Sequence, residues 1–391
     1  MMGEPNGDYR AVEVLPVRSG REKRDFLNFP WRIYRGDPLW VPPLIMDRRQ
    51  ATDPRRGEFF LHGEAEFFLA RRAGGEEVIG TICAAQDFAA NENTGMRDCV
   101  FGFLDFVDEP GVLDALVSAC EEWARARGLE FLFGPFNLDY ENSYGVLLEG
   151  RDRPPTLLCG HSPPYYAAAL DALGFQPARG DNIAYEIRLD RALPDYDRLE
   201  RLAESARSRR GFEVRGADFS HVEEEIDRVH GLLNRSLAHL PDYRPWERSA
   251  VKALLEPFVR FADPELVLFV EKDGKAIGFL PGLPNLNESI KTLNGLRGPL
   301  DYLRLPFVFR RRFECLTLKS ILVPPEYWGT GVGLILIYEM ARRLKDRGYR
   351  WLDLSLTSTD NPNTPPLAER FGGRIYKRYR VYRRPIGPAS G

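Results

Sequence analysis

The residues best suited to chemistry are three glycines near the C-terminus, at the alternate positions Gly329, Gly331 and Gly333. They follow a predicted strand, 314–323, and precede a helical pattern, 334–347. Glycine lets the backbone turn tightly and brings N–H groups close to a ligand, because it has no Cβ. The start of the helix adds unpaired donors and partial positive charge. Together these features predict an anion site suited to a pyrophosphate.

Two common phosphate-binding patterns do not fit this loop. A P-loop requires Lys and then Ser or Thr after its last glycine, whereas Leu334 and Ile335 stand there. A nicotinamide-binding fingerprint requires the spacing G-x-G-x-x-G near the start of a βαβ unit, with an acidic residue after the second strand. Neither pattern is present, so the loop belongs to another class of anion site.

The stretch around these glycines resembles the coenzyme A loop of the GNAT superfamily of acyl-CoA N-acyltransferases. That loop usually reads Val-x-Pro-x-Tyr-(Gln/Arg)-Gly-x-Gly-Ile-Gly. The matching positions follow without a gap: Val323, Pro325, Tyr327, Gly329, Gly331, Val332 and Gly333. Trp328 departs from the pattern, because Gln or Arg is usual there. The family spacing extends to Asn361 and Gly372, although Ala368 replaces the usual tyrosine.

The resemblance implies a co-substrate and a set of binding residues. Proteins of this superfamily use acetyl-CoA or another acyl-CoA, with the pyrophosphate on the amides of the glycine loop. The pantetheine arm would then run beside the strand 314–323. The implied coenzyme A contacts are Leu322, Val323, Trp328, Gly329, Thr330, Gly331, Val332, Gly333 and Asn361. No metal ion is expected.

The resemblance also implies direct attack of an amine on the thioester, which requires a proton acceptor and a proton donor. For the acceptor, Glu314 opens the strand before the loop and Glu288 follows an earlier strand end. Either could equally be a surface carboxylate. Tyr376 and Tyr379 are the candidate donors, because Ala368 lacks the usual hydroxyl. Aromatic packing on a β-surface is the simpler explanation for both tyrosines.

The composition excludes several classes of protein. A net charge of −3 over 391 residues gives no reason to expect a nucleic-acid partner. Five scattered cysteines indicate reduced thiols in a cytoplasm, without a disulfide framework or zinc-ligand spacing. The N-terminus is polar, and no apolar run reaches the roughly 20 residues needed to span a bilayer. We therefore expect a cytoplasmic protein.

The two halves of the chain share a weak repeat. Residues 112–126 form an amphipathic helical pattern that ends at Gly128 before a strand, as residues 332–347 do before Gly348. Such repetition at this length predicts two copies of one fold. The expected domains are 1–192 and 193–391, each of α/β (α+β) class with a mixed, mostly antiparallel sheet flanked by helices.

The N-terminal copy lacks the glycine loop. Asp108 and Glu109 precede its helix, where two carboxylates repel a pyrophosphate. We expect domain 1–192 to bind no coenzyme A and to have a structural or substrate-shaping role. His161 and Tyr166 lie in this half, and His161 is expected to be a hydrogen-bonding loop residue rather than a catalyst.

A segment between the predicted strands 275–283 and 314–323 is longer than the hairpin that a GNAT fold requires there. It carries apolar residues at helical spacing and ends in Arg310-Arg311-Arg312. Such a segment can line an acyl tunnel or lie on an anionic membrane surface. The alternative is an extra helix that covers a sheet edge or joins the two domains.

The whole chain also resembles a group of bacterial tandem GNAT-like proteins, in segments such as 34–44, 134–138 and 376–382. The prediction is an acyl-CoA-dependent N-acyltransferase acting on a small-molecule or lipid-like amine. Two alternatives remain. One is a GNAT-fold binding or scaffold protein without turnover, for which Trp328 and Ala368 are the evidence. The other is a transferase that uses a different acyl carrier.

Overall fold

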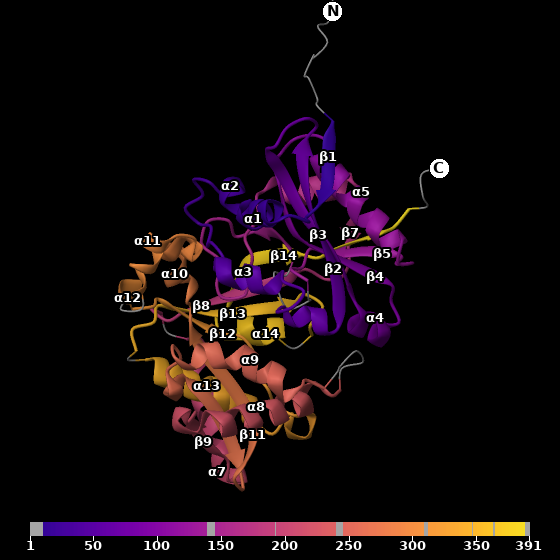
Figure 1. The fold of residues 1–391 in the computed structure, drawn as a ribbon. Helices are drawn as coiled ribbons and strands as arrows, with labels where there is room; N and C mark the ends of the chain where they lie inside the picture. The colour runs from indigo at the N-terminus through magenta and orange to yellow at the C-terminus, as the bar shows by residue number, and fades with distance from the viewer. Residues whose placement is uncertain are drawn as a thin grey trace, which may run out of the picture. The chain divides into compact units, whose positions relative to one another are not determined.

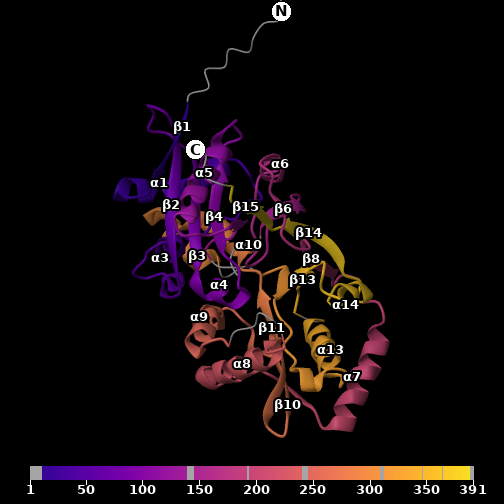
Figure 2. The same ribbon diagram turned by 90° about the vertical axis from the view of Figure 1, so that its right-hand side faces the viewer.

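A computed structural model describes residues 11–138, 145–191, 193–239, 245–308, 312–345, 347–362 and 364–387 (Figures 1 and 2). The chain divides into two compact units, and both draw on both halves of the sequence. Unit 1 consists of Met1–Asn182, Ile290–Val308 and Arg378–Gly391. Unit 2 consists of Ile183–Ser289 and Phe309–Lys377. These units therefore differ from contiguous domains with one boundary near residue 192.

The sheet of unit 1 is mixed, with strand order β1-β2-β3-β4-β5-β15-β7. Its pairings are antiparallel except between β4 and β5, which run parallel. In chain order the strands are β1 (Val12–Pro16), β2 (Gly63–Arg72), β3 (Val78–Asp87), β4 (Asp98–Phe106), β5 (Phe131–Gly134), β7 (Gln176–Pro177) and β15 (Tyr382–Pro385). A further strand, β6 (Val146–Glu149), pairs with residues 378–380 of β14.

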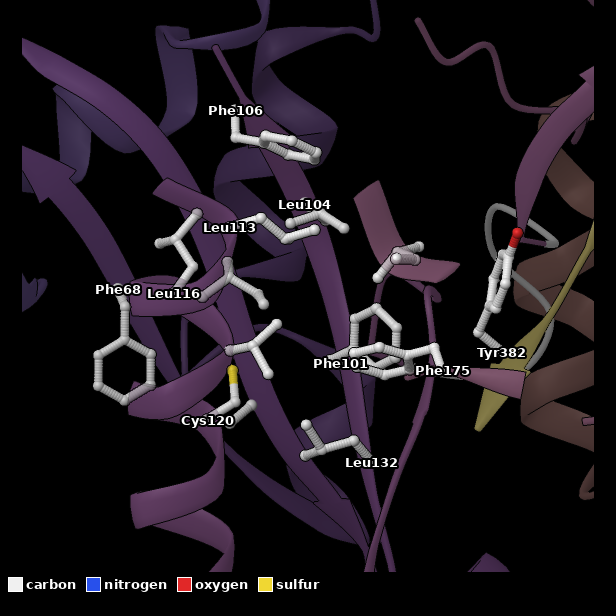
Figure 3. Close-up of a cluster of buried hydrophobic side chains, with 14 of the residues drawn as sticks. Phe68, Phe101, Leu104, Phe106, Leu113, Leu116, Cys120, Leu132, Phe175 and Tyr382 are labelled. Atoms are coloured by element: carbon white, nitrogen blue, oxygen red, sulfur yellow. The ribbon is translucent and has the colours of Figure 1, made fainter. Parts of the chain in front are cut away.

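Helices cover both faces of this sheet, because successive strand residues point to opposite faces. The helix α5 (Val112–Arg125) packs Leu116 and Cys120 against Phe101 and Phe68 (Figure 3). On the other face, α1 (Gly20–Asn28) and α3 (Ile45–Ala51) contribute to a second cluster with Val100 of β4. The remaining helices of this part are α2 (Pro30–Ile33), η1 (Glu58–Leu61), α4 (Phe88–Thr94) and α6 (Tyr165–Ala172).

The sheet of unit 2 has the strand order β14-β8-β13-β12-β11-β10-β9. The pair β12–β13 is parallel, whereas β9, β10, β11 and β12 pair antiparallel in turn. In chain order the strands are β8 (Asn182–Arg188), β9 (Glu213–Gly216), β10 (Val267–Lys272), β11 (Lys275–Pro284), β12 (Cys315–Leu318), β13 (Trp351–Ser358) and β14 (Arg374–Arg380). In both units a run of antiparallel strands is thus followed by a parallel pair, β4–β5 in unit 1 and β12–β13 in unit 2.

Two apolar clusters fill the two faces of this second sheet. On one face, α7 (Tyr196–Arg210) and α13 (Val332–Leu344) pack against Leu268 and Leu316. On the other, α8 (Val222–Leu237) and α9 (Arg248–Val259) pack against Phe269, the neighbour of Leu268 in β10. The other helices of this part are η2 (Phe219–His221), η3 (Pro264–Leu266), α10 (Asn287–Ile290), η5 (Pro325–Tyr327) and α14 (Thr364–Arg370).

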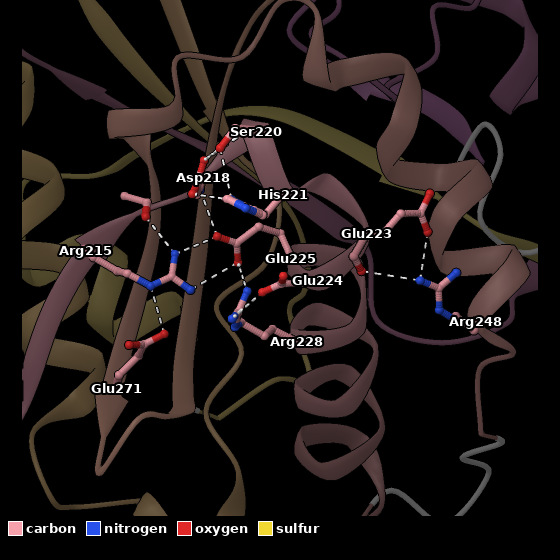
Figure 4. A network of polar contacts seen from close by, with 11 residues as sticks. Arg215, Asp218, Ser220, His221, Glu223, Glu224, Glu225, Arg228, Arg248 and Glu271 are labelled. Carbon is pink, nitrogen blue, oxygen red and sulfur yellow. Dashed lines mark hydrogen bonds and ion pairs between the residues drawn. The ribbon is translucent and has the colours of Figure 1, made fainter.

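A polar network ties the start of α8 to the edge of this sheet (Figure 4). Arg215 of β9 donates to Glu225 of α8 at 2.7 Å and to Glu271 of β10 at 2.8 Å. The backbone N–H of Asp218 also donates to Glu225, at 2.8 Å. These contacts fix the orientation of α8, because Glu225 is buried and joins the helix to β9 and to the turn at Asp218.

The predicted fold class is confirmed, with one shorter strand. The predicted strand 314–323 is paired only over Cys315–Leu318 of β12, and it returns to the sheet at Leu322. The predicted insertion becomes the short helices η4 (Lys291–Leu296), α11 (Pro299–Tyr302) and α12 (Leu305–Val308). Arg310 and Arg311 lie outside the described residues. Within the ranges that the structure describes, no helix is long and apolar enough to cross a membrane.

Candidate functional site

The glycine loop of unit 2 forms a tight turn that ends at the start of α13. Gly329 and Gly331 have φ values of +68° and +97°, in the left-handed region that favours glycine. Gly331 is the N-cap of α13, and the first turn of the helix closes with the N–H of Ile335 donating to the Gly331 carbonyl at 2.9 Å. The amides of Val332, Gly333 and Leu334 precede that bond, as at every helix start. Unpaired backbone N–H donors and the positive end of the helix dipole therefore lie together at the N-terminus of α13.

The loop is held by its own side chains. The Trp328 indole N–H donates to the Val323 carbonyl at 2.9 Å, and the Thr330 hydroxyl donates to the Tyr327 carbonyl at 2.6 Å. Trp328 is nevertheless 55% exposed, and its ring meets His239 edge-on at 4.8 Å between centroids. The turn is therefore preformed, with an accessible aromatic ring at its rim.

Two strands part next to this loop. The parallel pairing of β12 with β13 runs from Cys315↔Trp351 to Leu318↔Leu354. Past that point the chain stays beside β11, its other neighbour, because Leu322 exchanges hydrogen bonds with Phe279 of β11 at 2.9 and 3.0 Å. The edge of β13 beyond Leu354 is thereby released from β12. The glycine loop follows within a few residues of this divergence.

A buried polar cluster occupies the position where the strands part. Asp353 of β13 is fully buried and accepts the Tyr376 hydroxyl at 2.8 Å and the Ser355 hydroxyl at 2.7 Å. The Lys319 ammonium lies 3.4 Å from Asp353 and also donates to Ser355. The Lys319 side chain is 15% exposed, so it is the outermost charged member of the cluster. Lys319 and Ser355 are the first residues beyond the last β12–β13 pair.

Burial shifts the pKa values of two groups near this cluster, Glu288 and Cys315. Burial raises the pKa of Glu288, although its carboxylate accepts the backbone N–H groups of Glu314 and Cys315, each at 2.9 Å. Burial, with Asp353 and Glu288 nearby, raises the pKa of the Cys315 thiol well above its ordinary value. Cys315 is therefore a protonated packing residue and not a nucleophile.

Comparison with known proteins establishes the family. Residues 232–372 match the model of the acetyltransferase (GNAT) family. A bacterial ceramide synthase of Caulobacter vibrioides is 31% identical over 387 residues, covering 96% of this chain and 98% of that protein. This chain belongs to the GNAT family. Protein YghO of Escherichia coli is 28% identical over 384 residues, covering 95% of each chain.

Solved structures show the same architecture. A tandem GNAT protein from the clavulanic acid biosynthesis pathway aligns over 97% of this chain and all of that chain, with a TM-score of 0.54 and 15% identity. A GNAT protein from Sphaerobacter thermophilus aligns over 96% of each chain, with a TM-score of 0.50 and 14% identity. At these identities the likeness concerns the fold alone, and it confirms the prediction of a tandem GNAT fold.

The structure separates the predicted catalytic residues of this GNAT protein. Tyr376 lies in the buried cluster on Asp353. The Tyr379 hydroxyl belongs to unit 1 and donates to the Gly160 carbonyl at 3.1 Å. The Glu314 side chain is 60% exposed and lies 3.4 Å from Arg350 at the surface. Glu288, the alternative carboxylate, anchors the start of β12 through both oxygens.

Among the predicted coenzyme A contacts, the glycine loop has the expected geometry, but two other residues have competing bonds. The N–H of Leu322 already donates to Phe279, which differs from the expected contact with pantetheine. The Asn361 side chain accepts the backbone N–H of Thr364, the first residue of α14, at 3.2 Å. Its side chain therefore has a structural use at the start of α14.

In unit 1 the parallel strands β4 and β5 also diverge, but the residues that follow β5 bond to β4 across the gap. The parallel pairing of β4 with β5 ends at Val100↔Phe133. Beyond it, the N–H of Phe136 donates to the Phe101 carbonyl at 2.8 Å, and the N–H of Phe103 donates to the Asn137 side chain at 2.9 Å. These bonds fill the gap between β4 and β5 with groups of the chain itself. They favour the prediction that the N-terminal copy binds no coenzyme A.

Lys319, Asp353 and Ser355 were not identified from the sequence. Each sits in an ordinary strand pattern, and nothing in their spacing joins residue 319 to residues 353 and 355. The one available signal was charge, because Lys319 and Asp353 are the charged residues in the interior of strand patterns whose other interior polar residues are Ser and Thr. A charged residue within a buried strand requires a partner.

Proposed function

We propose that this GNAT protein is an N-acyltransferase that moves an acyl group from coenzyme A to an amine. The observation that carries the proposal is the glycine loop at the start of α13, directly beside the strands β12 and β13 that part. The loop supplies donors for a pyrophosphate, and the freed edge of β13 supplies backbone groups for an extended pantetheine arm. One ligand that has both features is an acyl-CoA.

The residues of the loop fit such a ligand. A Cβ added at Gly333 would meet its nearest neighbour, the Ile321 side chain, at 3.8 Å, so the helix start is open there. Gly331 is different, because a Cβ would lie 2.5 Å from Ala206 of α7. Gly333 thus leaves room for a ligand at the start of α13, whereas Gly331 allows α7 to pack closely against the loop. In this arrangement the amine attacks the thioester carbonyl carbon, and coenzyme A leaves as a thiol.

We further propose that the acyl chain or the amine is long and apolar. The support is twofold. The Caulobacter relative is a ceramide synthase by name, and a ceramide is an N-acylated sphingoid base. The segment 290–308 also exposes Leu300 and Leu303, which suits contact with a lipid or a membrane surface. The free cysteines suit a reducing cytoplasm, where we place the reaction.

Coenzyme A binding tests the loop directly. Gly333→Asp places a carboxylate at the second position of α13. There it interacts favourably with the positive end of the helix dipole, so the helix is kept, but it repels a pyrophosphate. We therefore expect a folded variant whose affinity for coenzyme A, measured by isothermal titration calorimetry, falls by at least about 100-fold, since a desolvated like-charge contact costs several kcal/mol. Gly231→Asp in α8 is the matched control, because nothing beyond the adjacent backbone of its own helix lies within 4 Å of its Cβ position. Equal affinity of Gly333→Asp and the intact protein would remove the loop from the binding site.

Turnover tests the rest of the proposal. The protein is incubated with acetyl-CoA or palmitoyl-CoA and with a short amine or a sphingoid base, and amide products are measured by mass spectrometry. We expect amide formation to be fastest with the long acyl donor and the long-chain amine. Tight coenzyme A binding without any amide product would favour the binding-protein alternative, and faster reaction of acetyl-CoA would contradict the long-chain proposal.

A further inference from the structure

We propose that Lys319 is the residue that carries the proton during acyl transfer, and that Ser355 and Asp353 position its ammonium group. The inference rests on the proposed N-acyltransferase function and names a residue for its chemical step. It replaces the carboxylate and tyrosine candidates suggested by the sequence.

The position of Lys319 carries the first part of the argument. It is the residue after Leu318, the last residue of β12 paired with β13, and Ser355 is the residue after Leu354 on the other strand. A thioester at the end of a pantetheine arm in this strand gap would therefore meet both residues. Glu314 lies at the opposite end of β12 and is exposed there, so it is poorly placed for the same role.

The contacts of the cluster carry the second part. Asp353 receives hydroxyl donors from Tyr376 and Ser355 on its two oxygens, which fixes the carboxylate rigidly. Lys319 then bonds Ser355 and lies 3.4 Å from Asp353, so its ammonium group is held on two sides. The three strands β12, β13 and β14 each contribute to this arrangement. A catalytic group held in this way loses little freedom in the reaction.

The burial of the Lys319–Asp353 ion pair indicates a role other than stabilising the fold. An ion pair removed from water is seldom more stable than apolar residues of the same volume, because desolvation cancels most of the attraction. The pair Lys319–Asp353 is nevertheless placed where the two strands diverge, with Asp353 fully inside and Lys319 partly accessible. The desolvation cost of this ion pair is explained if the Lys319 ammonium group acts on a ligand where the strands diverge.

The proton balance of the step is complete with Lys319 alone. The neutral amine forms the C–N bond at the thioester carbonyl, and the C–S bond breaks. The Lys319 ammonium gives one proton to the departing thiolate, and the resulting neutral Lys319 takes the proton that the attacking nitrogen loses. The products are an amide and a thiol, and Lys319 regains its starting state. No oxidant, metal ion or further reactant is required.

Tyr376 is a weaker candidate for the same transfer. Its hydroxyl is buried and donates to Asp353 at 2.8 Å. Loss of the phenolic proton would place two negative charges at hydrogen-bond distance, which is unfavourable inside a protein. We assign Tyr376 a positioning role through Asp353.

The test compares two substitutions of Lys319 by steady-state kinetics. Lys319→Met keeps the length of the side chain and removes the proton, whereas Lys319→Arg keeps the charge but cannot release a proton at neutral pH. We expect kcat to fall by about 100-fold or more in both variants, in the range of general acid–base catalysis. We expect KM for acyl-CoA and the affinity for coenzyme A to change by less than about threefold, because neither depends on proton transfer.

Controls separate this result from misfolding and from failure of the proposed function. Lys275→Met changes an exposed lysine of β11 in the same unit and should leave kcat unchanged. Tyr376→Phe should lower kcat by less than about tenfold, because a thiolate is a good leaving group and Tyr376 only positions Asp353. Normal kcat in Lys319→Met, or full rescue by Lys319→Arg, would overturn the inference. An intact protein that binds no acyl-CoA and forms no amide would instead overturn the function on which it rests.

Discussion

At the scale of single residues, unit 1 contains a carboxylate in an unfavourable place. Asp105 of β4 is buried and accepts the Tyr166 hydroxyl at 3.3 Å. Burial raises its pKa to about 6, and the opposing effects of Arg48, Tyr34 and Tyr166 are smaller. The folded protein therefore favours the protonated carboxyl, whereas the unfolded chain releases the proton near pH 4.

This difference makes stability depend on pH in a defined direction. The contribution of Asp105 is fully present below its unfolded pKa and is lost as the pH rises through about 6. Asp105→Asn should therefore raise the free energy of unfolding at pH 7.5 by up to about 3 kcal/mol, at about 1.4 kcal/mol per pKa unit. The gain should vanish near pH 4. Chemical denaturation at both pH values measures it.

The control for this experiment is Asp152→Asn, which alters an exposed carboxylate of the same unit. It should leave the free energy of unfolding within about 0.5 kcal/mol of the intact protein. A variant at Asp105 that is equally destabilised at both pH values would show that its hydrogen bonds outweigh the cost of burying its charge.

At the scale of elements, the segment 290–308 combines a firm anchor with an exposed apolar end. The Trp31 indole N–H donates to Asn294 at 2.9 Å, and Arg297 lies over the same ring at 4.6 Å. A Cβ on Gly295 would lie 2.4 Å from Trp31, so the backbone and the ring are in close contact. By contrast, Leu300 is 75% exposed and Leu303 is 68% exposed.

The surroundings of these leucines suggest an anionic surface as their partner. Exposed Arg304 follows Leu303 directly, and Arg297 precedes α11. The double substitution Leu300→Ser and Leu303→Ser should weaken binding to vesicles of phosphatidylglycerol by at least about tenfold, because each buried leucine contributes about 1.5–3 kcal/mol. Vesicle sedimentation measures the loss. The anchor at Trp31 is untouched, so the fold should persist.

Leu61→Ser provides a matched control, since Leu61 is 87% exposed in another part of unit 1. It should bind vesicles as the intact protein does. Vesicle binding that is the same for the double variant, or that is equally strong on neutral phosphatidylcholine, would show that the segment serves another purpose.

At the scale of the whole molecule, each sheet contains a strand from the opposite half of the chain. The strand β15, near the C-terminus, lies between β5 and β7 in the sheet of unit 1. The strand β8, which ends the N-terminal half, lies between β14 and β13 in the sheet of unit 2. Tyr382 of β15 is fully buried in the core of unit 1, near Phe175 and Phe101 (Figure 3).

This exchange predicts that neither half of the chain folds alone. The fragment 1–192 lacks β15, and the fragment 193–391 lacks β8, so each leaves an unpaired gap inside a sheet. We expect both fragments to give collapsed amide proton spectra by NMR, and the two together to recover the dispersed spectrum of the intact chain. A well-dispersed spectrum from fragment 193–391 alone would show that β8 is dispensable to its sheet.

Features that depend on neighbouring residues could be predicted from the sequence alone. The glycine loop, the helix after it and the repeated helix–glycine–strand pattern were all visible, because tight turns, caps and amphipathic helices are local. The helix predicted at 112–126 is observed as Val112–Arg125, and the predicted strand 275–283 as Lys275–Pro284. The family resemblance followed from the same local pattern.

The neighbours of each strand, and the side chains that meet between them, emerged only from the folded structure. Strand pairing depends on hydrogen bonds between segments that are distant in the chain, so the exchange of β8 and β15 left no local mark in the sequence. For the same reason Lys319 could not be joined to Asp353 and Ser355, although the parallel register of β12 and β13 brings them together. Residue types indicated which chemistry to expect, and the long-range pairing of the strands determined which side chains of the candidate site meet.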